Sequence, residues 1–161
     1  MRISSILPRT RVSTGAKDAP TNKAQVIHQL AELLTRGSDL DRNEVERQLL
    51  ERETVLSTGI GEGVAIPHTS IAAAKEQTAA LLIVPHGVDF ESCDGAPATI
   101  FFGVIGPKQA ASEHLKILAK VSKLLRKIET RRRLLESTTA EQAHTLILEH
   151  EKSELGPVCA P

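Results

Sequence analysis

Apolar residues recur at helical spacing in the first third of the chain. Residues 22–36 place valine, isoleucine and leucine side chains on one face, which predicts an amphipathic helix. Asn22 is suited to cap its start, and Gly37 to end it. A second helix is predicted over 41–51, where Asp41 supplies a cap and the apolar positions again share one face.

Two further helices are predicted near the end of the chain. Residues 112–127 form one, with Ser112 as its cap, and residues 139–151 form the other, with Thr139 and Gln142 as a capping box. The apolar stripe of the helix over 112–127 is expected to consist of Leu115, Leu118, Ala119, Ser122, Leu125 and Ile128.

Continuous apolar runs between these helices predict buried strands. They cover residues 64–66, 78–84 and 98–105, and Pro67 and Pro85 are expected to end the first two. Ile3 to Leu7 suits a short edge segment. Strands that alternate with helices predict an α/β fold, in which helices cover a mixed sheet.

Composition restricts the classes of function. A length of 161 residues suits one domain, and equal numbers of basic and acidic residues, 20 of each, argue against nucleic-acid binding. No apolar run reaches the ~18 residues of a membrane span, so no membrane insertion is expected. Without an apolar leader, and with Cys93 and Cys159 as the only cysteines, a reducing cytoplasm is the expected location. Residues 151–161 are expected to form a flexible tail.

The stretch 57–71 has the most informative sequence. Gly59, Gly61 and Gly63 lead into the strand over 64–66, and Pro67 and His68 follow. This spacing matches neither a dinucleotide fingerprint nor a Walker loop, because no helix opens here and no lysine follows the glycines. The stretch is therefore a turn, shaped by glycines, that presents a histidine at the end of a strand.

The same stretch resembles the phosphorylation-site signature of a known family. Glu53, six residues, Ile60-Gly61, two residues, and then the run 64–68 follow the pattern of IIA domains of the bacterial phosphoenolpyruvate-dependent phosphotransferase system, of the fructose/mannitol/nitrogen-regulatory type. The resemblance covers residues 3–150. It implies a single domain, with a small mixed β-sheet of about five strands flanked by helices on both faces.

The resemblance also implies the site and its chemistry. His68 would accept a phosphoryl group from the phosphocarrier HPr or its nitrogen-branch paralogue, as a tele-phosphohistidine. Arg52 and His114 would support that group, together with backbone N–H groups of the glycine turn. No cofactor and no metal are implied. A metal site made of His68, His86, Cys93 and His114 is a remote alternative, because their spacing matches no ligand motif.

Three outputs remain open. The nitrogen-regulatory type, which controls partner proteins through its phosphorylation state, is favoured over a sugar-uptake component that passes phosphate to a IIB domain. A binding protein without phosphotransfer is the third, because Thr69 and Ser70 replace the small and basic residues usual in the family. For a regulator, Ile66 and Ile71, beside the phosphorylated residue, are expected to contact a partner only while the phosphoryl charge is absent.

Overall fold

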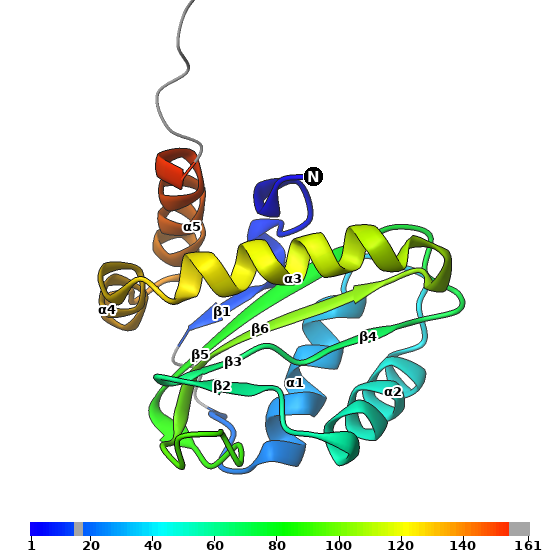
Figure 1. Ribbon diagram of the computed structural model, residues 1–161, viewed down its shortest axis with the longest axis horizontal. Helices are drawn as coiled ribbons and strands as arrows, with labels where there is room; N and C mark the ends of the chain where they lie inside the picture. The colour runs from blue at the N-terminus through cyan, green and yellow to red at the C-terminus, as the bar shows by residue number, and fades with distance from the viewer. Residues whose placement is uncertain (15–17, 155–161) are drawn as a thin grey trace, which may run out of the picture.

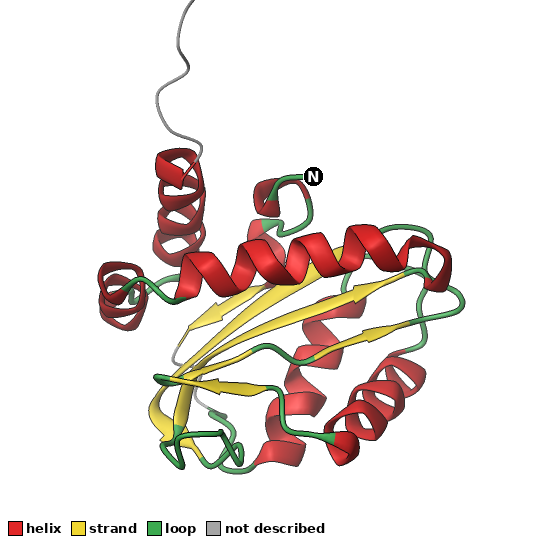
Figure 2. Ribbon diagram, in the orientation of Figure 1, coloured by secondary structure: helices red, strands yellow, loops and turns green. Residues whose placement is uncertain are grey.

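The computed structural model describes residues 1–14 and 18–154, and shows one sheet between two layers of helices (Figures 1 and 2). The described α-helices are α1 (Lys23–Thr35), α2 (Arg42–Val55), α3 (Ala111–Leu125), α4 (Ile128–Glu136) and α5 (Ala140–Glu154). The strands are β1 (Val12–Thr14), β2 (Gly59–Gly61), β3 (Val64–Ala65), β4 (His68–Ser70), β5 (Thr78–Val88) and β6 (Ala98–Gly106). Short 3₁₀ turns are η1 (Ile3–Ser5), η2 (Arg9–Arg11) and η3 (Lys108–Ala110).

The described sheet is mixed and has six strands: five follow the order β1-β5-β6-β3-β2, and the sixth, β4, also pairs with β6. β6 is its central strand: it runs antiparallel to β5 and parallel to β3 and β4, which follow one another along its other edge. The predicted mixed sheet is therefore confirmed.

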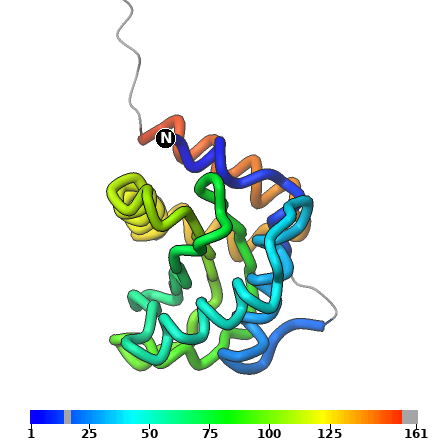
Figure 3. The backbone as a smooth tube through the Cα atoms, turned by 90° about the vertical axis from the view of Figure 1, so that its right-hand side faces the viewer, coloured from blue at the N-terminus to red at the C-terminus, as the bar shows by residue number. Residues whose placement is uncertain are grey.

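A hydrophobic core lies on each face of the sheet, as predicted. On one face, α1 and α2 cover a cluster that includes Ala65, Leu82 and Phe101. On the other, α3 and α5 cover a cluster that includes Val64 and Phe102. Figure 3 shows the N-terminal segment alongside α5, although these segments are far apart in the sequence. Alternate residues of each strand thus face different helix layers.

The first two helices follow the sequence closely. The Asn22 side chain accepts a hydrogen bond from the Gln25 backbone N–H at 2.9 Å, which confirms the predicted cap. Asp41 caps α2 in the same way, through the N–H of Asn43. However, α2 continues to Val55, so Arg52 lies in its last turn and not beyond its end.

The predicted stripe of α3 was partly wrong: Leu125 is buried and Leu118 packs against the core, as expected, but the other buried positions differ. The buried side chains are His114, Ile117, Val121, Leu124 and Leu125, whereas Leu115 is 67% exposed and Ile128 lies beyond the end of the helix. Apolar residues occur around most of this helix, so the pattern alone did not decide which face is buried. Ser112 is not its cap either, because the helix begins at Ala111.

One strand end was also wrong. Pro67 follows the end of β3, as expected, although the chain pairs with β6 again afterwards as β4. In contrast, β5 continues through Pro85 to Val88. Proline is tolerated at sheet edges and irregularities. Pro85 lies where the β5–β6 register shifts, between Ile83 and Val88, so its missing N–H interrupts no regular ladder there.

The two ends of the described chain are joined. The segment expected as an edge strand near Ile3 is the turn η1, and its backbone N–H groups at Ile3 and Ser4 donate to the buried carboxylate of Glu151. The last helix, α5, ends at Glu154 and not at its expected end, 151. Glu151 is buried, so it does not begin a flexible tail as expected. The remainder of the expected tail, 155–161, lies outside the described residues.

Candidate functional site

His68 lies at the edge of the sheet, between the two layers of helices. It is the first residue of β4, and it pairs with Val104 of β6. The strand before Pro67 and the strand after it form an almost continuous edge. His68 thus follows the end of β3, as expected, and is also the start of a further strand. Its side chain is half-buried.

The backbone fixes which ring nitrogen of His68 is free. Its Nδ1 lies 2.7 Å from the carbonyl oxygen of Ile66. A carbonyl oxygen can only accept, so Nδ1 carries the hydrogen, and the neutral ring has its lone pair on Nε2. Nε2 is therefore the nucleophilic atom of this imidazole.

His114 lies beside His68, in the first turn of α3. The two ring centroids are 5.9 Å apart, and the planes are inclined at 46°. His114 is only 7% exposed, and its Nδ1 lies 2.9 Å from Oε1 of Gln77. Its Nε2 is buried and has no hydrogen-bond partner among the described residues. The predicted pair of histidines is therefore brought together, and one ring offers an unused polar atom.

Both imidazoles are held neutral by their surroundings. Burial is the main cause that lowers the pKa of His68, and the positive charge of Arg52 lowers it further, while the hydrogen bond to Ile66 and the charge of Glu53 oppose these effects. Burial also lowers the pKa of His114, followed by repulsion from His68. A neutral ring is the form that can act as a nucleophile near pH 7.

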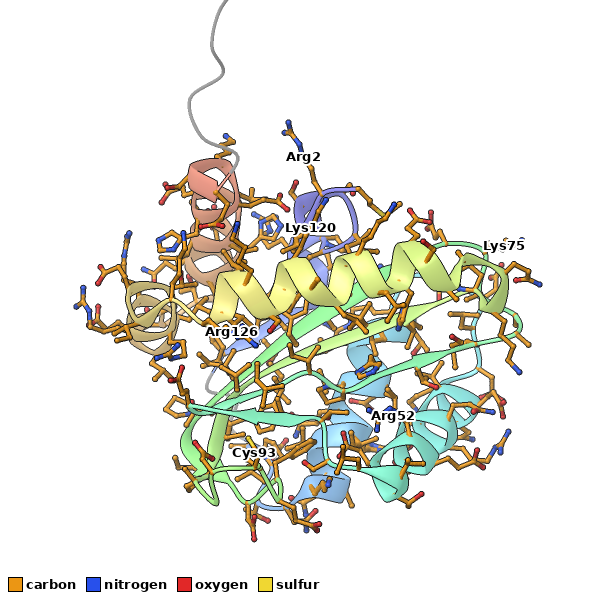
Figure 4. All side chains as sticks on the ribbon, in the orientation of Figure 1. Arg2, Arg52, Lys75, Cys93, Lys120 and Arg126 are labelled. Atoms are coloured by element: carbon orange, nitrogen blue, oxygen red, sulfur yellow. The ribbon has the colours of Figure 1, made fainter. Side chains whose placement is uncertain are left out.

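Arg52 brings a permanent positive charge close to His68. One of its guanidinium nitrogens donates to the carbonyl oxygen of Leu56 at 2.8 Å, just beyond the last turn of α2. Figure 4 shows its side chain between α2 and the sheet. A guanidinium has five N–H donors, so several remain for an anion. Arg52 both caps its helix and acts electrostatically on His68.

Glu53 supports the backbone that orients His68, a role that the sequence did not assign. Its buried carboxylate accepts from the backbone N–H and the hydroxyl of Thr58, and pairs with Lys23 at 2.9 Å. The carbonyl of Thr58 in turn accepts from the N–H of Ile66 at 3.0 Å. The sequence feature that could have indicated this role is the place of Glu53 at the start of the phosphorylation-site signature.

The glycine turn does not lie at the imidazole. Val64 pairs with Ile100 and His68 with Val104, four positions further along β6, or about 13 Å at strand spacing. At the tip of the turn, the N–H of Glu62 donates to Asp94 at 2.8 Å. The expectation that this turn supplies N–H groups to a phosphoryl group is therefore wrong. The glycines form the β2–β3 hairpin instead.

The four residues of the metal alternative do not gather. The Nε2 atom of His86 lies 3.0 Å from the carbonyl of Pro20. Cys93 lies beside Gly61 in the glycine turn, away from His68. Within residues 1–14 and 18–154, no group of three or more His, Cys, Asp or Glu side chains is placed to hold a metal ion. Across the same residues, no helix is long and apolar enough to span a membrane.

A family model described as "Phosphoenolpyruvate-dependent sugar phosphotransferase system, EIIA 2" matches residues 6–150. The chain belongs to this EIIA family. This assignment agrees with the resemblance that the stretch around His68 shows.

The relatives of this EIIA chain include proteins named as nitrogen regulatory proteins and proteins named as sugar-specific components. It is 31% identical over 134 residues to a "Nitrogen regulatory protein" of Pseudomonas aeruginosa, covering 83% of this chain and 87% of that protein. It is 33% identical over 153 residues to a "PTS system fructose-specific EIIABC component" of Bacillus subtilis, covering 94% of this chain but only 24% of that protein. The crystal structure of the nitrogen regulatory protein IIA-Ntr from Neisseria meningitidis superposes with a TM-score of 0.82 at 32% identity, covering 90% of this chain and 98% of that one.

The exposed apolar surface of this EIIA domain differs from the expected one. Ile66 and Ile71 are 5% and 3% exposed, so neither can contact a partner. Other apolar side chains are exposed on the elements that carry the site. Leu115, directly after His114, is 67% exposed, and Val55 and Leu56 at the end of α2 are 80% and 71% exposed.

Proposed function

We propose that the protein is a phosphohistidine carrier and that His68 is its acceptor. The observation that carries this proposal is the hydrogen bond from Nδ1 to the carbonyl of Ile66, because it leaves Nε2 as an unprotonated nucleophile. Family membership supports a phosphotransfer role in general, and the geometry of His68 supports the choice of residue and atom.

The transfer needs no bound metal, because the donor is itself a phosphohistidine of HPr or its paralogue. The Nε2 lone pair of His68 attacks phosphorus, the donor's N–P bond breaks, and the electron pair of that bond returns to the donor imidazole. The chain's own part is to position the acceptor and stabilise charge. Arg52 supplies a positive charge, and His114 offers its buried Nε2 to a phosphoryl oxygen once that nitrogen is protonated.

The surface around the site suits a protein donor. Val55 and Leu56 on one side and Leu115 on the other are large apolar side chains left exposed beside the residues of the site. Exposed large apolar side chains on the elements that carry reactive groups suit contact with a protein. The proposed location is the cytoplasm, where an exposed thiol such as that of Cys93 stays reduced.

For the output, we propose regulation of partner proteins by phosphorylation state. The similarity to IIA-Ntr over 98% of that chain supports this choice. A phosphoryl group adds roughly −1.5 to −2 charges at the exposed apolar surface. A partner that fits the uncharged surface would dissociate on phosphorylation, because burial of an unpaired charge is unfavourable. The fructose-specific relative favours the second candidate, transfer to a IIB domain, at similar identity.

The test is incubation with phosphoenolpyruvate, enzyme I and each type of HPr, followed by intact mass. Wild type should gain one acid-labile phosphoryl group, His68→Ala none, and the matched control His86→Ala the same as wild type. Labelling of the His68→Ala variant would refute the assignment of the acceptor. Rapid discharge to a IIB domain, with equal partner binding before and after phosphorylation, would refute the regulatory output.

A further inference from the structure

Gln77 is a buried polar residue in contact with His114. It lies directly before β5 and is 3% exposed. Its Oε1 is 2.9 Å from Nδ1 of His114, and its Nε2 donates to the carbonyl oxygen of Ala110 at 3.4 Å. Gln77 thus bridges the turn before α3 and the histidine in the first turn of that helix.

The partners of Gln77 determine the orientation of its amide. Ala110 presents a carbonyl oxygen, which can only accept, so the amide nitrogen must face it. The amide oxygen then faces His114, and the nitrogen opposite must carry hydrogen. In neutral His114 the proton is therefore on Nδ1, and the bare nitrogen is Nε2, the buried atom without a partner among the described residues.

The sheet leaves room for this amide. A Cβ atom at Gly106 would lie 2.1 Å from Oε1 and 2.4 Å from Nε2 of Gln77. Contacts under about 3 Å would force one group to move, and the free end of a side chain moves more readily than a strand. The glycine at the end of β6 is thus what allows Gln77 to reach His114.

We propose that Gln77 is a positioning residue that directs the proton taken up by His114 to Nε2, where it can bind the phosphoryl group on His68. This inference rests on the proposed function. With Nδ1 already donating to Gln77, the only nitrogen of His114 that can gain a proton is Nε2. Retention of the phosphoryl group should then follow the protonation of His114. A bare Nε2 repels phosphoryl oxygens, and a protonated Nε2 donates to them.

Few charged groups face His114. The ionisable group that acts on it is His68, which in turn is influenced by Arg52 and Glu53. The strand packed beneath it, β6, carries no ionisable side chain, and η1 carries none either. Lys108 of η3 is exposed. At the far end of α3, Lys123 and Lys127 pair with Glu154 of α5. A charge introduced at residue 77 should therefore act on His114 with little competition.

The first measurement is the tautomer of His114, by ¹⁵N NMR of the unphosphorylated protein. Nδ1 should have the shift of a protonated ring nitrogen and Nε2 that of an unprotonated one. Gln77→Leu should lose this preference, and so should Gly106→Ala, which displaces the amide without changing it. The opposite tautomer in wild type, or no change in either variant, would overturn the proposal.

The second measurement is the phosphorylated fraction at equilibrium with HPr, as a function of pH. In wild type it should fall as pH rises through the pKa of His114 in the phosphorylated protein. Gln77→Glu places a carboxylate on Nδ1, which favours the imidazolium, and should move the midpoint up by about one pH unit or more. Gln77→Leu should flatten the profile, since either tautomer is then available. Gln109→Glu, the same charge change at an exposed position, should keep the wild-type midpoint.

Equal midpoints for wild type, Gln77→Glu and Gln77→Leu would overturn the positioning role, even if all three are phosphorylated. A wild type that gains no phosphoryl group would instead overturn the proposed function. The tautomer measurement would still decide what Gln77 does, because it uses the unphosphorylated protein.

Discussion

The two histidines of the site differ in what holds Nδ1. In His68 it is the backbone carbonyl of Ile66, and in His114 it is the side chain of Gln77. His68 is half-buried at the sheet edge, whereas His114, in the first turn of α3, is only 7% exposed. The same residue type thus meets two different environments within one site.

This difference explains why one imidazole is proposed as acceptor and the other as a binding group. The carbonyl of Ile66 lies between β3 and β4 and is a rigid anchor, because the N–H of the same residue donates to Thr58, and it leaves the Nε2 of His68 without a hydrogen. The Nε2 of His114 is buried, with a solvent-accessible area close to zero. A buried nitrogen is out of reach of phospho-HPr, so His114 is not expected to take the phosphoryl group from it. The Nε2 of His114 can instead contact a phosphoryl group that is already bound to His68.

The largest expected effect separates these two roles. His68→Ala should abolish phosphorylation, because the nucleophile is removed. His114→Ala should still be phosphorylated, but about 10²–10³-fold more slowly, the usual effect of removing one group that stabilises developing charge. Single-turnover labelling by phospho-HPr measures both rates. Equal loss of labelling in both folded variants would contradict the division of roles.

The support behind His68 gives the next effect. Glu53→Gln removes the charge that pairs with Lys23 and weakens the bonds to Thr58. Breaking a buried ion pair costs about 3–5 kcal/mol, and because the Lys23 side chain keeps 21% of its exposure, we expect about 2 kcal/mol here. Urea unfolding measures this loss. The control Glu51→Gln, 60% exposed in the same helix, should stay within about 0.5 kcal/mol of wild type.

If Glu53→Gln and Glu51→Gln unfold at the same urea concentration, the hydrogen bonds of Glu53 do not stabilise the backbone before His68. The labelling rate of Glu53→Gln in the absence of urea should also fall, because Ile66 is then held less firmly.

Arg52→Lys should have a smaller effect, on rate alone. Lysine keeps the charge but loses the planar fork that binds two phosphoryl oxygens at once. We expect transfer to be about tenfold slower, which corresponds to about 1.4 kcal/mol in the barrier, with the thermal midpoint nearly unchanged. Arg47→Lys, an exposed substitution in the same helix, is the control. A large loss of stability at a normal rate would show that Arg52 matters for the helix cap instead.

The smallest effect concerns the pH dependence of stability. The pKa values of His68 and His114 are both lowered in the folded protein, so protonation favours the unfolded chain. Stability should be full above about pH 6.5, the unfolded value, and should be lost as pH falls through the lowered folded values. The double variant His68→Gln, His114→Gln should show a flatter profile between pH 7 and 5. A profile as steep as that of wild type would place the acid sensitivity elsewhere.

Much of the fold followed from the sequence because its patterns are local. Asn22 and Asp41 cap their helices, and the apolar runs before Pro85 and Gly106 form the two long strands. What failed depended on tertiary context. The run after Pro67 became β4 because the free edge of β6 was available to it, and the buried stripe of α3 was decided by packing against the sheet.

In the candidate site, too, the residues with a sequence pattern were predicted and those that depend on tertiary context were not. His68, Arg52 and His114 were named from the family resemblance, and the structure brings them together. Nothing in the sequence indicated Gln77, since a polar residue before a strand carries no local signal, and its contact with His114 spans 37 positions. The glycine turn was misplaced for a related reason: closeness in sequence to His68 became about 13 Å along an extended strand.

The central claim, that His68 accepts the phosphoryl group on Nε2, is tested most directly by ¹⁵N and ³¹P NMR of the phosphorylated protein. The account predicts that phosphorus is coupled to Nε2 of His68, and that Nδ1 keeps its hydrogen and its bond to the carbonyl of Ile66. Phosphorus on Nδ1 of His68, or on His114, would contradict it.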